Sequence, residues 1–165
     1  MLSRVADTLY WMSRFVERAE GVTRLVEVYR DSDLEVDARR GDVSYWQPTL
    51  LALCAQEEFD EDEMEEPASF LLFSSQWSNS VLNSINSARE NARMVRDQLS
   101  EEIWVELNTI YHFLNSPKAL AEYQNNESSF FRRIIRFFLV FQGLSDATIH
   151  HDEGWRFMSL GKYLE

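Results

Sequence analysis

Residues 68–116 contain neither a proline nor a glycine. Short strands of a small sheet are joined by tight turns that depend on these two residues, whereas helix interiors exclude both. The whole chain has only three prolines and five glycines. The sequence therefore predicts an all-α fold.

The length and the apolar content predict one domain. A chain of 165 residues can bury a sizeable core, and 45% apolar with 13% aromatic residues is typical of a folded protein. We therefore expect a single helical domain over residues 1–165.

Apolar residues recur at intervals of three and four from Val5 to Tyr29, which predicts a long first helix. Ser100 is a suitable N-cap for a later helix, and Pro117 marks a corner of the chain. A last helix is expected to begin near Ser145 or Asp146. Further helices are predicted over about 44–58, 67–73, 80–95, 101–114 and 129–142. The pattern indicates a bundle of about six or seven helices.

The helix over 129–142 is almost entirely apolar except for three arginines that share one side. These residues are Arg132, Arg133 and Arg136. We expect a central bundle helix with one solvated edge. A helix on a membrane surface is the alternative, which the acidity of the chain disfavours.

The formal net charge is −12. Much of it comes from residues 57–66, EEFDEDEMEE, which hold eight acids. Such a run is typical of a solvated loop, and less often of a docking site for a basic partner. The acidity excludes nonspecific nucleic-acid binding, which needs a basic surface.

Cys54 is the only cysteine, so no internal disulfide is expected and a reducing compartment is favoured. Its neighbours are apolar, which predicts a small core residue. The sequence shows neither a signal segment nor an apolar run long enough to span a bilayer. We expect a cytoplasmic protein that does not enter the membrane.

Residues 9–17 and 157–165 match in chemical kind at a constant offset of 148. Ser13 corresponds to Gly161, Arg14 to Lys162, Phe15 to Tyr163, and Glu17 to Glu165. The first copy continues with Arg18, whereas the second stops at its glutamate. This repeat predicts that the first and last helices carry related units.

Three stretches hold charged residues where helical packing favours apolar ones. They provide the candidate site residues Arg14, Glu17 and Arg18, then Arg89, Glu90, Arg93 and Arg96, and finally His150, His151, Asp152 and Arg156. Spacings of three and four make Arg14, Glu17 and Arg18 neighbours on one helix. Spacings of four and seven place the guanidinium groups of the second stretch, those of Arg89, Arg93 and Arg96, on one helix face.

If these faces converge, they form a network of arginines and carboxylates. One interpretation is a structural network that fixes helix register. The other is an anion pocket whose arginines bind phosphate or carboxylate bidentately. A buried, paired Arg93 predicts a loss of roughly 3–5 kcal/mol on replacement by alanine. A loss below about 1 kcal/mol places it on the surface.

Metal or cofactor chemistry has weak support. A di-iron bundle needs two Glu-x-x-His pairs, and the chain has none. His150 and Glu153 are three residues apart, a spacing that is compatible with a single metal site or with proton transfer. Glycine-rich phosphate loops, nucleophile elbows and zinc spacings are absent. We therefore predict no metal and no cofactor.

In its charged stretches the sequence resembles the bacterial alpha-E domain family, a predicted helical domain with a recurring Glu-Arg motif. The matching segments are 3–7, 11–20, 88–97, 100–104, 107–108 and 150–157. The resemblance implies an all-helical domain of unknown biochemical role. It also implies an association with ATP-grasp-like proteins and transglutaminase-like proteases.

The chain departs from the family pattern in two ways. Family members typically continue beyond the second Glu-Arg motif, and the acidic run is an individual insertion. A short or truncated member is expected, one that could complete itself as a homodimer. The leading interpretation is an accessory module that binds a protein partner, an ATP-grasp-type peptide ligase or a transglutaminase-like protein. The alternative is a ligand-binding or catalytic domain that uses the arginines with Glu17 and His151.

Overall fold

The computed structural model describes residues 2–32, 43–59, 66–149 and 152–165. Within these residues the chain forms eight α-helices and one 3₁₀ turn. The helices are α1 (Ser3–Ser32), α2 (Val43–Ala52), α3 (Pro67–Phe73), α4 (Val81–Met94), α5 (Glu101–Leu114), α6 (Pro117–Asn125), α7 (Glu127–Thr148) and α8 (Glu153–Tyr163), and the 3₁₀ turn is Arg96–Gln98. The predicted all-α class is confirmed.

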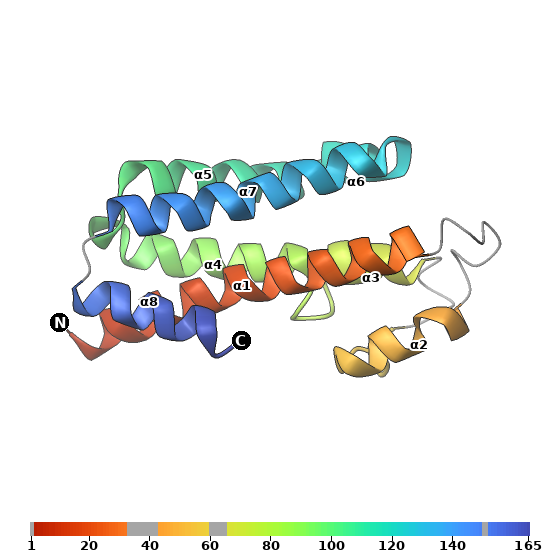
Figure 1. Cartoon of the computed structure of the whole chain (residues 1–165), viewed down its shortest axis with the longest axis horizontal. Helices are drawn as coiled ribbons and strands as arrows, with labels where there is room; N and C mark the ends of the chain where they lie inside the picture. The colour runs from red at the N-terminus through yellow and green to blue at the C-terminus, as the bar shows by residue number, and fades with distance from the viewer. Residues whose placement is uncertain (1, 33–42, 60–65, 150–151) are drawn as a thin grey trace.

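Four helices form an up-and-down bundle. α1 packs against α4, α4 against α5, α5 against α7, and α7 closes the ring against α1 (Figure 1). Successive members of this set run in opposite directions. α6 covers one end between α5 and α7, and α8 lies along the first half of α1.

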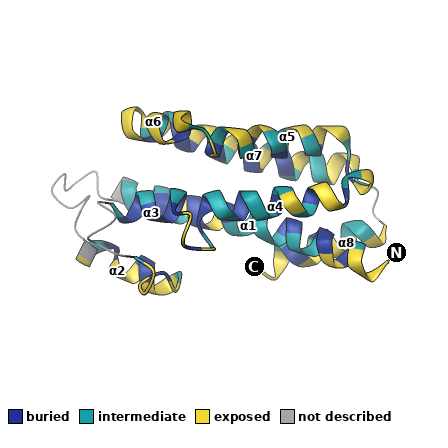
Figure 2. Cartoon of the chain, turned by 180° about the vertical axis from the view of Figure 1, so that it is seen from behind, coloured by how far each residue is buried: buried dark blue, intermediate teal, exposed yellow. Residues whose placement is uncertain are grey.

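The core lies between these four helices and extends to α2, α3, α6 and α8, which add residues such as Trp46, Phe70 and Met158. Their inward residues are buried and their outward residues are exposed (Figure 2). The largest fully buried side chains include Met12, Ile85, Ile103, Phe130 and Phe138. The periodic stripe of α1 is buried from Leu9 to Val26 and half-buried at its ends, Val5 and Tyr29. This fixes the orientation of the helix to which the candidate site residues Arg14, Glu17 and Arg18 belong.

Side-chain caps set the starts of two bundle helices. The Ser80 hydroxyl accepts a hydrogen bond from the Asn83 amide at 3.1 Å, and the Ser100 hydroxyl accepts one from Ile103. The predicted cap at Ser100 is confirmed.

The prediction of six or seven helices was wrong. Pro117 does not merely turn the chain; it opens α6, where a missing amide costs nothing because a first-turn amide has no helical partner. α7 also continues past Gln142 to Thr148. Its C-terminal half includes Gly143, and the Ser145 hydroxyl donates back to the Phe141 carbonyl at 2.8 Å. α8 therefore begins at Glu153, not near Ser145 or Asp146.

The prediction that Cys54 is a core residue was also wrong, because its side chain is exposed. α2 ends at Ala52, and Cys54 takes a left-handed conformation with φ 51°. The amide of Ala55 then donates to the Leu50 carbonyl at 2.8 Å, as in a Schellman motif. This turn points Cys54 outward and buries Ala55 instead.

The acidic run is described only at its two ends. Glu57 and Glu58 are exposed, while Phe59 packs against Phe70 with ring centroids 5.2 Å apart. Glu66 precedes α3 and accepts a hydrogen bond from the Tyr123 hydroxyl at 3.1 Å. Residues 60–65, the centre of the predicted acidic loop, lie outside the described residues.

The arginine edge predicted on α7 is confirmed, because Arg132, Arg133 and Arg136 are all exposed. Within the described residues, every helix is too short or too polar to cross a membrane.

Candidate functional site

The two copies of the repeated motif lie side by side. α8 runs parallel to the first half of α1 (Figure 1). Gly161 sits against the α1 backbone so closely that an added Cβ would lie 2.2 Å from the Tyr10 carbonyl oxygen and 3.3 Å from the Arg14 amide. Ser13, its counterpart in the first copy, is buried as well. The copies therefore pack in register, with their small residues at the contact.

The second-copy glutamate is held by the first-copy arginines. The Glu165 carboxylate accepts from Arg14 Nε at 2.6 Å, from Arg18 Nε at 2.5 Å and from Arg18 Nη2 at 3.1 Å. All three side chains are less than 30% exposed. Burial alone would raise the pKa of Glu165, but the hydrogen bonds from Arg18 and Arg14 outweigh it and lower that pKa.

Both arginines have further partners on the domain. Arg18 donates to the Asn79 side chain at 2.9 Å, which ties the cluster to the segment before α4. The Arg14 guanidinium lies over the Trp11 ring at 5.4 Å and also donates to the Tyr10 hydroxyl. Glu165, Asn79, Trp11 and Tyr10 thus bind or contact the two arginine side chains from within the domain. A network that fixes helix register requires such internal partners.

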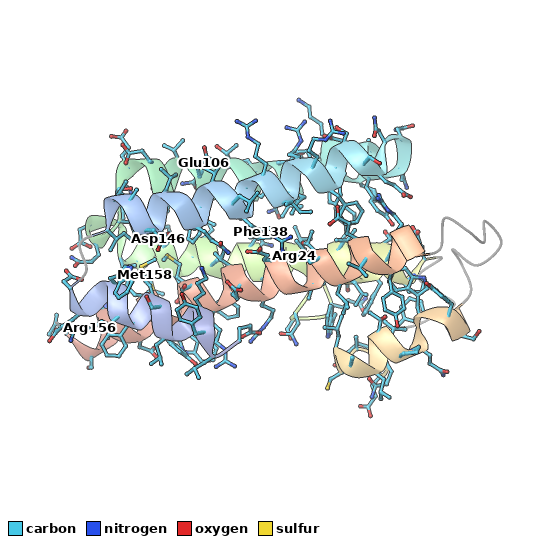
Figure 3. The ribbon with its side chains drawn as sticks, in the orientation of Figure 1. Arg24, Glu106, Phe138, Asp146, Arg156 and Met158 are labelled. Carbon is cyan, nitrogen blue, oxygen red and sulfur yellow. The ribbon has the colours of Figure 1, made fainter. Side chains whose placement is uncertain are left out.

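Glu17, the first-copy glutamate, has a different environment. It borders a small cavity of about 40 Å³ between α1, α7 and α8, which Lys162 and Asp146 also line. Figure 3 shows Met158, another lining residue, on the side of α8 that faces Asp146 of α7. Burial and the neighbouring Glu20 raise the pKa of Glu17, and Lys162 opposes this.

We expect Glu17→Gln to stabilise the protein at neutral pH. The pKa of the Glu17 carboxyl is higher in the folded than in the unfolded chain, so the folded chain binds this proton more tightly. As pH rises above 4.5, the loss of the proton lowers the free energy of unfolding, and glutamine avoids that loss. The gain should be below about 1 kcal/mol, because the group is partly solvated. Urea unfolding at pH 7 and pH 4 measures it. The gain should vanish at pH 4, and a gain that is equal at both values would contradict this assignment.

The second charged stretch forms a separate cluster between α4 and α5. The guanidinium groups of Arg89 and Arg96 each lie 5.5 Å from the Trp104 ring, and Arg89 also lies 4.9 Å from the Tyr111 ring. Arg89 Nε donates to the Asn108 side chain at 3.2 Å. Two guanidinium groups thus lie near one indole ring.

Arg93 lies on the outside of this cluster. It pairs with Glu90 at 3.0 Å, but the two side chains are 62% and 50% exposed. The hydrogen bond that Arg89 donates to Glu90 at 2.5 Å lowers the pKa of this carboxyl, and the hydrogen bond from Arg93 adds to the effect.

We therefore expect Arg93→Ala to cost less than about 1 kcal/mol, the range of an exposed ion pair. Chemical denaturation of the purified variant measures the cost. A loss above about 2 kcal/mol would place Arg93 in a buried network instead.

The third stretch is described only from Asp152 onward. His150 and His151 lie outside the described residues. Asp152 caps α8 by accepting from the Trp155 amide at 3.2 Å. Arg156 is exposed and lies on the outer side of α8 (Figure 3).

The charged stretches do not merge into one network among the described residues. Arg14 and Arg18 bind the end of α8, whereas Arg89 and Arg96 contact α5. The described residues also hold no cluster of three His, Cys, Asp or Glu suited to a metal ion.

An apolar surface on α8 is the feature that the sequence did not predict. Phe157, Leu160 and Leu164 are 38%, 46% and 57% exposed. Two adjoining grooves of about 650 and 360 Å³ border it, both lined by Ser3, Ala6, Phe157 and Leu160. The repeat contained the signal, because the same three positions in the first copy are core residues. We call Phe157, Leu160 and Leu164 the α8 face.

A family model for a predicted alpha-helical domain with a conserved ER motif, Alpha-E, matches residues 1–165. The chain belongs to the Alpha-E family. The only Glu-Arg dipeptide in the sequence is Glu17-Arg18, and Glu165 is the counterpart of Glu17 in the second copy. In this Alpha-E domain the arginine of the first copy binds the glutamate of the second.

The curated relatives carry names that assign them no function. Proteins of Mycobacterium bovis and of two strains of Mycobacterium tuberculosis are 29% identical over 182 residues. The match covers 98% of this chain and 21% of each relative, so the chain spans about a fifth of their length. No solved structure matches the chain at a significant level.

Proposed function

We propose that this Alpha-E domain is a helical interaction module that binds a partner protein through the α8 face. The observation that carries the proposal is the exposure of three large apolar side chains in a row on α8, beside two grooves. Contiguous apolar patches of this kind on a folded domain mark interaction sites.

The chemistry of the charged residues supports the same function. The arginines of the first stretch are engaged by Glu165 and Asn79. An enzyme site needs a nucleophile, acid or base with a free approach to substrate. The ion pairs instead fix α8 on α1, and so hold the α8 face in a defined position.

The proposed partner is an ATP-grasp-type peptide ligase or a transglutaminase-like protein, as the family resemblance implies. Relatives about five times longer support a role beside other domains, since the matched region is 21% of their length. We further propose that the module works in the cytoplasm.

Isothermal titration of the purified domain against the ATP-grasp-type ligase of the same organism tests this proposal. Leu160→Glu should weaken binding at least tenfold, because it places a charge in the apolar contact. Leu139→Glu is the matched control, since Leu139 is 57% exposed on α7. Equal binding by wild type and Leu160→Glu would contradict the proposed surface. Absence of binding to either the ligase or a transglutaminase-like protein would contradict the proposed partner class.

A second function rests on the cluster around Trp104. Two guanidinium groups beside one indole ring could hold an anion such as a phosphate or an acidic peptide. A thermal-shift assay with phosphate, ATP and a glutamate-rich peptide tests it. This function predicts a rise in Tm that Arg96→Ala removes, and no rise with any of the three ligands contradicts it.

A further inference from the structure

We propose that the partner segment on the α8 face is a single amphipathic α-helix that runs antiparallel to α8 and packs on it as α4 packs on α1. This inference rests on the proposed function and specifies the kind of segment that occupies the surface. It follows from a comparison of the two motif copies position by position.

The faces of α1 and α8 that meet each other use equivalent positions. Gly161 of α8 contacts the backbone at Tyr10 and Arg14, and its counterpart Ser13 borders the cavity together with Met158 and Lys162. Met158 and Lys162 are themselves the counterparts of Tyr10 and Arg14. The two helices are therefore related by an approximate twofold axis that runs parallel to both.

The faces beside this contact also use equivalent positions, but only the face on α1 is covered by other helices. Phe157, Leu160 and Leu164 correspond to three residues of α1 that are almost fully buried. Those are Leu9, Met12 and Val16, at 2%, 0% and 3% exposure. α4 is the helix with which α1 makes its most extensive contact. α7 packs on α1 as well, and both α4 and α7 run antiparallel to it. The twofold relation therefore places an antiparallel covering helix on α8, and we take α4 as the model for it.

The buried positions of α4 indicate which side chains a helix needs in order to pack on the α8 face. Its buried positions are small or branched, including Ile85, Ala88 and Ala92, which lets it approach α1 closely. It carries Arg93 in its last turn. An antiparallel helix on α8 would bring its C-terminal end to the start of α8, where Arg4, Asp7, Asp152, Glu153 and Arg156 are all exposed. Because these side chains carry both signs, the partner helix is defined by its apolar face and not by its charge.

The charge of the domain favours such a partner over a second copy of the chain. With a net charge of −12, two identical chains repel each other, which disfavours a second copy as the occupant. The curated relatives have about four-fifths of their length outside the matched region, which is ample for a covering helix.

A peptide of residues 80–95, which reproduces α4 with its Ser80 cap, is a direct probe. Fluorescence anisotropy of the labelled peptide with the whole domain should show saturable binding that a scrambled peptide lacks. Leu160→Glu should weaken this binding at least tenfold, and Leu139→Glu should leave it within about twofold of wild type. Circular dichroism of each variant verifies that it is folded.

Three outcomes would overturn the inference. The first is peptide binding no stronger than that of the scrambled control, and the second is equal binding by wild type and Leu160→Glu. The third is a dimer in sedimentation equilibrium that Leu160→Glu dissociates, which would make a second copy the occupant. If the ligase binds and depends on Leu160 while the peptide does not bind, this inference fails and the proposed function stands.

Discussion

Gly161→Ala is expected to destabilise the domain by about 3 kcal/mol, the upper end of the cost of overpacking. The new Cβ would lie 2.2 Å from the Tyr10 carbonyl oxygen, a backbone atom that cannot rotate away. α8 must therefore move off α1, and the ion pairs of Glu165 lengthen with it. Urea unfolding measures the loss, and hydrogen exchange over residues 153–164 locates it.

Gly143→Ala is the matched control for this experiment. Gly143 lies within α7, and no heavy atom lies within 4 Å of the position that an added Cβ would take. Alanine there should stabilise the helix by roughly 0.5–1 kcal/mol, as expected for glycine in a helix interior. A Gly161→Ala variant as stable as wild type would show that α8 does not pack closely on α1.

Arg18→Ala should cost about 1.5–3 kcal/mol, the range of a hydrogen bond to a charged group, because it removes two of the three bonds to Glu165. Its contact with Asn79 is lost as well. Chemical denaturation of Arg18→Ala, Glu165→Gln and the double variant gives the coupling energy. Additive losses would show that the pair contributes nothing beyond its separate members.

The same pair predicts a pH dependence. The pKa of Glu165 is lowered from 4.5 in the folded state, so its contribution is complete above the unfolded pKa. It is lost as pH falls through the lower folded pKa. The stability difference between wild type and Glu165→Gln should therefore shrink as pH falls below about 4.5. A difference that grows on acidification would contradict this ion pair.

The fold class could be predicted because it depends on local patterns. The three-and-four spacing along α1 and the cap at Ser100 are both visible in the sequence and both present in the structure. The helix boundaries near Pro117 and Gln142 were missed for a physical reason. A proline can open a helix as well as end one, and a glycine such as Gly143 need not stop a helix.

The candidate site could be predicted only in part. An ion pair between two residues of the same charged stretch can be predicted from their spacing along the helix, as for Arg93 and Glu90 on α4. The partner of Arg18 is 147 residues away, and no local pattern specifies such a contact. The α8 face was missed because apolar spacing reports which side of a helix is apolar and not whether anything covers it. Only the packing of α8 against α1 shows that Leu160 is left exposed.

Hydrogen–deuterium exchange of the domain, alone and with the ATP-grasp-type ligase, tests the central claim most directly. We predict protection over residues 153–164 on α8, with the outer edge of α7 at Arg132 and Arg136 unchanged. Protection confined to the cluster around Arg89 and Trp104, with α8 unchanged, would contradict this claim and make the arginine cluster the contact surface instead.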